Sequence, residues 1–214
     1  MNEPIKNTIA LPQIADRFRG RVASILGNEQ FRKNAVLVPL LQQNGQLCVL
    51  FEQRAKTLRR QPGEICFPGG RVEPQDKNPQ TAALRETSEE LNLPLHSIQY
   101  MGDLDILVTY SQMIVYPFVG CLPNVASIQP NPDEVEKVII LPLERLLAIH
   151  PERHDVAISV HPDENFPYHW IPQGKQYPWR TGTVSQFFYR VDEELIIWGL
   201  TARILYHFLR VIQP

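Results

Sequence analysis

The chain has 214 residues, of which 43% are hydrophobic and 21% are charged, so it can bury a core and is not a disordered class of protein. Its formal charge of −2 provides no global positive field for nucleic acid or an anionic membrane. There is no apolar run long enough to span a membrane, no secretory-type start and no paired cysteine framework, so we expect a cytoplasmic protein that binds neither nucleic acid nor membrane.

Two elements are predicted in the first quarter of the chain. Apolar residues recur at spacings of three and four between Pro12 and Leu26, which predicts an amphipathic helix. Two apolar runs then flank Asn44-Gly45, a dipeptide that supplies the positive φ angles of a tight β-hairpin. We therefore expect a helical extension over residues 1–33, followed by one domain over residues 34–214.

The rest of the chain alternates strand-like and helix-like segments. A helix is predicted from Pro79 to Leu91, with Asn78 as its N-cap. The segments 98–108, 113–122 and 135–141 have the composition of strands, and a short helix is expected at 143–148. Prolines interrupt residues 150–182, which predicts long loops with short strands, before a strand at 186–191 and a C-terminal helix from about residue 196. The alternation predicts an α/β fold with a mixed sheet between helices.

The predicted helix at 79–91 carries three carboxylates on one face. Glu86, Glu89 and Glu90 lie at positions i, i+3 and i+4, and like charges at this spacing repel by about 0.2–0.5 kcal/mol per pair. A divalent cation such as Mg²⁺ would compensate them, because it prefers oxygen ligands. Taken without their context, these residues are more typical of a solvated acidic helix face.

The context changes that interpretation. Phe67-Pro68-Gly69-Gly70 precedes the helix, and its two glycines permit close approach of the backbone to a ligand. Together, Gly70, Asp76, the run from Arg85 to Glu90 and Leu93 resemble the Nudix box of hydrolases that cleave a nucleoside diphosphate linked to another group. The spacing departs from the general pattern, because 14 residues separate Gly70 from Arg85, one more than usual. Thr87 occupies an aliphatic position and Asn92 a glycine position, the latter a mild change because asparagine tolerates a left-handed helix end.

A narrower resemblance accounts for the extra residue. Arg54, Ala55, Arg59, Gly63 and the Phe-Pro-Gly-Gly run are similar in kind and spacing to a motif of the coenzyme A pyrophosphatase branch of the Nudix family, whose box commonly has the same insertion. With softer similarities at 116–120 and 197–202, the resemblance covers residues 35–205.

The resemblance implies a role for each box residue. Glu86 and Glu90 would hold Mg²⁺ or Mn²⁺, Glu89 would complete the set, and a carbonyl of Gly69 or Gly70 would add a further ligand. Arg85 would orient a box carboxylate through a charge-assisted bond. The general base would be a box glutamate or a glutamate from a later loop, for which Glu134 is the first candidate. For Glu134, the interpretation as an exposed loop carboxylate with no catalytic role is equally good.

The upstream motif would bind the substrate. Arg54 and Arg59 are expected to contact phosphates, because arginine binds them bidentately, and Gly63, Phe67, Gly69 and Gly70 belong to the same substrate-binding motif. For Phe67, and likewise for Trp198, core packing is favoured over contact with a base.

The implied fold is a Nudix-type α/β/α sandwich. The implied activity is metal-dependent cleavage of coenzyme A or acyl-CoA to adenosine 3′,5′-bisphosphate and (acyl-)4′-phosphopantetheine, and a homodimer is compatible with it. Two alternatives stay open: a Nudix hydrolase of ADP-ribose, NADH or nucleoside triphosphates, and a non-catalytic Nudix-like sensor, which the intact carboxylates disfavour.

Overall fold

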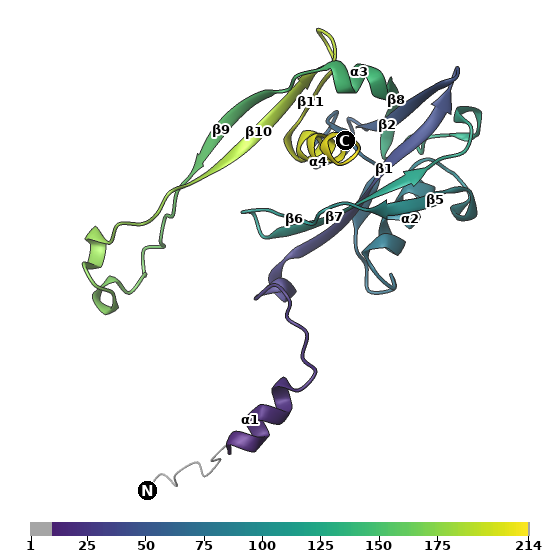
Figure 1. Cartoon of the computed structure of the whole chain (residues 1–214). Coiled ribbons are helices and arrows are strands. Elements are labelled where there is room, and N and C mark those ends of the chain that lie inside the picture. Colours follow the sequence, from purple (N-terminus) through teal and green to yellow (C-terminus); the bar gives the residue numbers. More distant parts are fainter. Residues whose placement is uncertain (1–9, 214) are drawn as a thin grey trace, which may run out of the picture. The chain divides into compact units, whose positions relative to one another are not determined.

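The computed structural model describes residues 10–213, and the chain divides into a unit of residues 1–31 and a unit of residues 32–214. In the first unit, α1 covers Leu11–Phe18 and a 3₁₀ turn covers Asn28–Gln30 (Figure 1). The prediction of a helix as far as Leu26 is wrong. Arg19 is extended and Gly20 has a φ angle of +74°, so the backbone leaves the helical region there.

An eight-stranded mixed sheet forms the centre of the second unit. The predicted hairpin is confirmed: β1 (Arg32–Gln43) and β2 (Gln46–Arg54) are antiparallel and joined by Asn44 and Gly45, whose φ angles are +50° and +78°. On its other side, β1 pairs in parallel with β7 (Met113–Cys121). β8 (Val135–Pro142) pairs antiparallel with β2.

Four shorter strands complete this sheet: β3 (Ile65–Cys66), β4 (Gly69–Arg71), β5 (Gln99–Asp103) and β6 (Leu107–Val108). The predicted strand at 98–108 is therefore two strands. β5 pairs with the C-terminal part of β7, and β6 pairs with the N-terminal part of the same strand. The chain therefore leaves the sheet after β5 and returns to β7 nearer its beginning.

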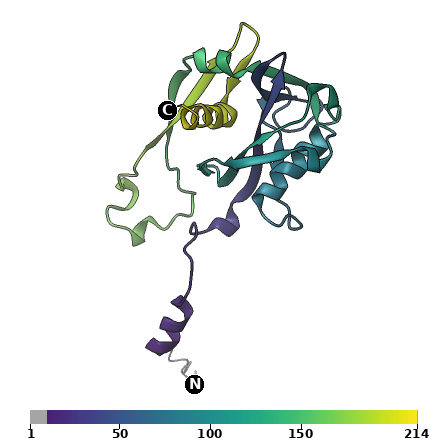
Figure 2. The same cartoon turned by 45° about the vertical axis from the view of Figure 1, so that its right-hand side comes forward.

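Helices cover both faces of the sheet (Figure 2). Alternate residues of β1 face opposite layers: Leu37 packs in one cluster with Ala83 of α2 (Pro79–Glu90), and Val38 packs in another with Leu205 of α4 (Gly199–Val211). The short helix α3 (Leu143–Ala148) lies where the sequence predicts it and adds Leu146 to the α4 side. The α/β/α sandwich with a mixed sheet is confirmed.

Residues 150–182 contain more regular structure than the prolines suggest. β9 (Glu152–Ile158) pairs over its full length with β10 (Gly182–Arg190), and β11 (Ile196–Trp198) completes a separate three-stranded sheet. The prolines at 162, 167, 172 and 178 fall in the connection, which has 3₁₀ turns at Tyr168–Trp170 and Gly174–Gln176.

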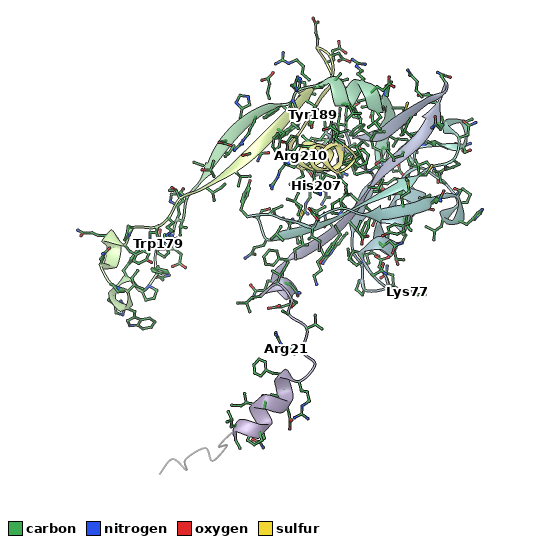
Figure 3. All side chains as sticks on the ribbon, viewed as in Figure 1. Arg21, Lys77, Trp179, Tyr189, His207 and Arg210 are labelled. Atoms are coloured by element: carbon green, nitrogen blue, oxygen red, sulfur yellow. The ribbon has the colours of Figure 1, made fainter. Side chains whose placement is uncertain are left out.

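The second sheet packs against the core at the C-terminal end of β10. Tyr189 of β10 is buried in the α4 cluster (Figure 3). The last helix begins at Gly199 rather than near Ile196, because residues 196–198 pair with β10. Within residues 10–213, no helix has the length and apolar character needed to cross a membrane.

Candidate active site

The helix α2 has the ends that its sequence predicts. The Asn78 side chain accepts a hydrogen bond from the Thr81 N–H at 2.9 Å, which caps the first turn. At the other end, Asn92 has a φ angle of +48°, the left-handed conformation that a glycine would otherwise supply. Thr87 is fully buried and donates its hydroxyl to the Ala83 carbonyl at 2.7 Å. The departures from the box pattern at Thr87 and Asn92 are therefore accommodated locally.

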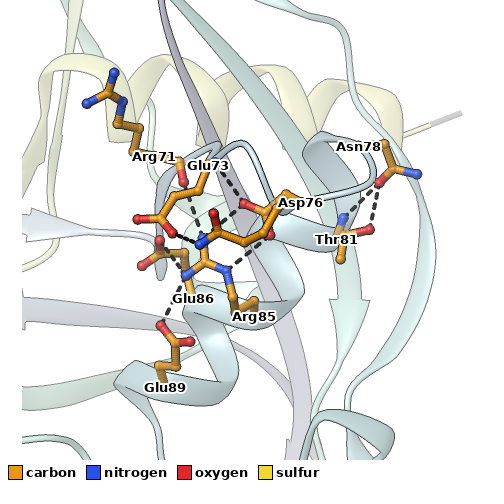
Figure 4. Close-up of polar contacts among 9 residues, drawn as sticks. Arg71, Glu73, Asp76, Asn78, Thr81, Arg85, Glu86 and Glu89 are labelled. Atoms are coloured by element: carbon orange, nitrogen blue, oxygen red, sulfur yellow. Dashed lines mark hydrogen bonds and ion pairs between the residues drawn. The ribbon is translucent and has the colours of Figure 1, made fainter.

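Arg85 is clamped by Asp76 and directed toward two box glutamates (Figure 4). Its Nε and Nη2 atoms each donate to an Asp76 carboxylate oxygen at 3.1 Å. Its Nη1 lies 2.9 Å from Glu86 and 3.1 Å from Glu89. Hydrogen bonding from Arg85 lowers the pKa of Asp76. Asp76 thus fixes the guanidinium, as a bidentate carboxylate partner does, and the predicted orienting contact of Arg85 with box carboxylates is present.

Glu90 lies beneath the glycine loop. Its Oε2 accepts a hydrogen bond from the Gly69 N–H at 2.8 Å. Only glycine fits at position 69, because φ is +145° and a Cβ would lie 2.3 Å from the Ala35 carbonyl oxygen. Burial raises the pKa of Glu90 to about 8, despite the opposing Gly69 hydrogen bond. The loop therefore places a carboxyl where it lacks sufficient counter-charge.

Gly70 is the second point of close approach. A Cβ at this position would lie 2.4 Å from the carboxyl carbon of Glu86. Burial also raises the pKa of Glu86, although Arg85 acts against the shift. The paired glycines thus bring two box carboxylates, Glu86 and Glu90, against the loop backbone.

Glu52 is a site residue that the motif did not reveal. It lies on β2, is 1% exposed, and its Oε1 atom has no hydrogen-bond partner among the described residues. Burial, followed by the charge of Glu90, raises its pKa well above the usual value. A signal was present in the sequence: Glu52 continues the inward-facing series of Cys48 and Leu50, so strand alternation places a carboxyl on a buried face.

Glu134 comes from a separate loop to the same group of carboxylates. Its charge raises the pKa values of Glu52, Glu86 and Glu90, while the residue itself is exposed. Its carbonyl accepts a hydrogen bond from the Ala55 N–H at 2.8 Å, which joins this loop to the upstream motif. The structure therefore brings Glu134 to the rim of the cluster.

Glu89 is arranged differently from the other two box glutamates. Its side chain is 56% exposed and pairs with Arg85. Its charge raises the pKa of Glu86. We define the carboxylate cluster as Glu52, Glu86, Glu90 and Glu134, and Glu89 lies at the outer side of this cluster.

The carboxylate cluster fits a divalent cation in chemistry and charge. The raised pKa values of Glu52 and Glu90 and the unpartnered Oε1 of Glu52 indicate that these buried carboxylates lack compensation, which a hard cation with oxygen ligands supplies. Within residues 10–213, no three His, Cys, Asp or Glu side chains are already gathered at metal-ligand spacing. Binding would therefore require side-chain adjustment.

The upstream motif forms the turn between β2 and β3. Gly63, with a φ angle of +73°, donates its N–H to the Arg54 carbonyl at 3.1 Å, so its role here is to shape the turn. The buried Nε of Arg54 has no hydrogen-bond partner in the described part of the chain. Arg59 is exposed on the turn. The two arginines thus occupy different environments.

A cavity of about 500 Å³ opens beside the carboxylate cluster. Arg54 and Gly69 line it together with residues of β10 and α4. Phe67 also borders it but is 3% exposed and stacks on Phe51 at 4.9 Å, which confirms the expectation of core packing. Trp198, by contrast, is 47% exposed and stacks on Phe188, so for this residue the core prediction is wrong.

The domain model described as the NUDIX domain matches residues 31–160. The chain belongs to the Nudix hydrolase family. The mouse (Mus musculus) protein named "Peroxisomal coenzyme A diphosphatase NUDT7" is 37% identical over 150 residues, which are 70% of this chain and 63% of the mouse protein. The match thus spans less than two thirds of that relative's length.

A bacterial relative covers more of this Nudix hydrolase. The protein from Photorhabdus laumondii named "Uncharacterized Nudix hydrolase NudL" is 31% identical over 182 residues, 85% of this chain and 86% of its own length. Among solved structures, a MutT/nudix family protein from Enterococcus faecalis has a TM-score of 0.47 and 16% identity, over 96% of this chain and 71% of that one.

Proposed function

We propose that this Nudix hydrolase is a Mg²⁺- or Mn²⁺-dependent pyrophosphohydrolase that cleaves the diphosphate of coenzyme A or acyl-CoA. The products would be adenosine 3′,5′-bisphosphate and (acyl-)4′-phosphopantetheine. The observation that carries the proposal is the position of Arg54. Its positive charge lowers the pKa values of both Glu52 and Glu90, and the same residue lines the cavity. The 37% identical mouse relative, named a coenzyme A diphosphatase, supports this substrate.

The side chains have distinct tasks in this reaction. Glu86 and Glu90 would hold the cation, with Glu52 and a carbonyl of Gly69 or Gly70 as further oxygen donors. When bound, the cation supplies neutralisation of the diphosphate charge. Arg54, which lines the cavity, would bind a diphosphate oxygen through its guanidinium group.

Glu134 is suited to the proton transfer. It is exposed at the rim of the carboxylate cluster, where it would accept a proton from water as the water oxygen bonds to phosphorus and the phosphoanhydride P–O bond breaks. Asp76 would act as a positioning residue, because it holds Arg85 against Glu86 and Glu89.

One assay tests the substrate and the cofactor together. Coenzyme A, ADP-ribose, NADH and a nucleoside triphosphate would each be incubated with Mg²⁺, Mn²⁺ or chelator, and the products separated by chromatography and identified by mass. We expect the highest kcat/KM for coenzyme A or its acyl form and no turnover in chelator. Faster cleavage of ADP-ribose, NADH or the triphosphate would overturn the substrate, and full turnover in chelator would overturn the cation.

A further inference from the structure

The cavity beside the carboxylate cluster has mainly apolar walls. Val36 of β1, Val115 of β7 and Ile204 of α4 line it in the body of the domain. Val156 and Val184, which are paired across β9 and β10, line it from the second sheet. A surface of this kind favours a neutral ligand segment, because burying phosphate against apolar walls is costly unless it is paired.

The charges are distributed unevenly between the cavity and its surroundings. Of the described residues that line the cavity, two are cationic, Arg54 and Arg203, and one, Glu64, is anionic. The exposed turn that follows Arg54 carries Lys56, Arg59 and Arg60, none of which lines the cavity. The turn is therefore the more basic of the two surfaces.

The cavity also offers hydrogen-bonding groups at intervals along its walls. The amides of Asn34 and Gln186 and the hydroxyl of Ser111 lie among the lining residues. Thr201, at the start of α4, donates to the Ile65 carbonyl at 3.1 Å, which fixes α4 against β3. Apolar walls with a few polar groups in a formed cavity are typical of small-molecule sites.

The two halves of coenzyme A differ in the same way as these two surfaces. The nucleotide half carries a 3′-phosphate, whereas the pantetheine arm is uncharged and has two amides, a hydroxyl and a pair of methyl groups. We propose, on the basis of the proposed function, that the cavity binds the pantetheine arm and that the basic turn, Lys56, Arg59 and Arg60, binds the nucleotide half. Val184 and Gln186 of β10 then help to determine specificity.

The two reaction products separate the two halves experimentally. Binding of 4′-phosphopantetheine and of adenosine 3′,5′-bisphosphate would be measured by calorimetry in Mg²⁺ buffer for the full chain and its variants. In V184W the indole fills part of the cavity, so we expect affinity for 4′-phosphopantetheine to fall by roughly tenfold or more while bisphosphate affinity is unchanged. Arg59→Ala should show the reverse pattern.

A neighbouring position on β10 supplies the matched control. Thr183 is exposed and does not line the cavity, and its side chain points to the opposite face from that of Val184. T183W should bind both products as the wild type does. If V184W fails to fold, Gln186→Ala makes a smaller change and should also weaken 4′-phosphopantetheine selectively.

Each remaining outcome has a defined meaning. Loss of bisphosphate affinity in V184W would place the nucleotide half in the cavity, and unchanged affinity for both products would show that the cavity is not a substrate site. Either result overturns the inference, as does the absence of 4′-phosphopantetheine binding by the wild type. Coenzyme A hydrolysis by the wild type, measured in parallel, separately decides the proposed function.

Discussion

Gly70 and Glu86 are so close that a Cβ at position 70 would lie 2.4 Å from the glutamate carboxyl carbon. The obstruction is confined to the end of a flexible side chain, because the nearest atoms are all in the Glu86 carboxylate. Position 69 differs, since there the obstruction is the backbone of Ala35 and Val36. A methyl group at position 70 can therefore displace a site carboxylate without disturbing the sheet.

The first prediction follows from this contact. Gly70→Ala should fold with little change in melting temperature and lower kcat/KM by roughly 10- to 100-fold, because small displacements of catalytic groups have effects of this size. Gly102→Ala is the matched control, since a Cβ there meets nothing within 4 Å. Steady-state kinetics and thermal melts check the pair, and wild-type kinetics in Gly70→Ala would contradict the close-approach argument.

The second prediction concerns the cation. Glu86→Gln and Glu90→Gln each keep the side-chain shape but remove a charge, so both should lose most turnover and bind Mn²⁺ more weakly. Glu89→Gln should have a smaller effect on Mn²⁺ binding, because that side chain is exposed and paired with Arg85. Calorimetric Mn²⁺ titration measures this directly. Unaltered Mn²⁺ affinity in both variants would remove these glutamates from the ligand set.

The third prediction is a pH dependence of stability in chelator. The folded chain holds the Glu90 proton more tightly than the unfolded chain, because the pKa rises from 4.5 to about 8. This group therefore destabilises the metal-free fold progressively as the pH rises from about 5 to 8. Thermal melts should show that decline in the wild type and a shallower one in Glu90→Gln. An identical pH profile for the two proteins would contradict the assignment.

The fourth prediction tests proton transfer by Glu134. If this residue activates water, Glu134→Gln should lower kcat by ~10²–10⁴-fold with little change in Mn²⁺ affinity. Glu136→Gln, an exposed neighbour two positions away, serves as the control and should retain wild-type kcat. A loss below about tenfold would return the role to a box glutamate.

The fifth prediction separates the two arginines of the upstream motif. Arg54→Ala should lower kcat/KM for coenzyme A and dephospho-coenzyme A alike, because Arg54 lies beside the carboxylate cluster. Arg59→Ala should reduce coenzyme A cleavage by roughly 1.5–3 kcal/mol, the scale of a charged hydrogen bond, and leave dephospho-coenzyme A unaffected. Parallel kinetics on the two substrates check this. If Arg59→Ala lost the same factor in kcat/KM on coenzyme A and on dephospho-coenzyme A, the 3′-phosphate would be excluded as the partner of Arg59.

The sequence by itself determined the local features of this protein. The Asn44-Gly45 turn, the Asn78 cap and the left-handed Asn92 follow from backbone preferences of single residues, and they lie where the pattern predicts. The shared face of the box carboxylates follows from helical periodicity. These features depend on neighbours a few positions away, so the linear order contains them.

Only the tertiary structure decided which distant groups meet. Glu52, Glu90 and Glu134 come from a strand, a helix and a loop, and their mutual repulsion appears only once β2, α2 and the loop before β8 are packed together. Similarly, β9 forms from a proline-interrupted segment because β10 supplies its hydrogen-bonding partner. Strand pairing and the burial of a charge depend on contacts across the fold, and for that reason local propensity does not encode them.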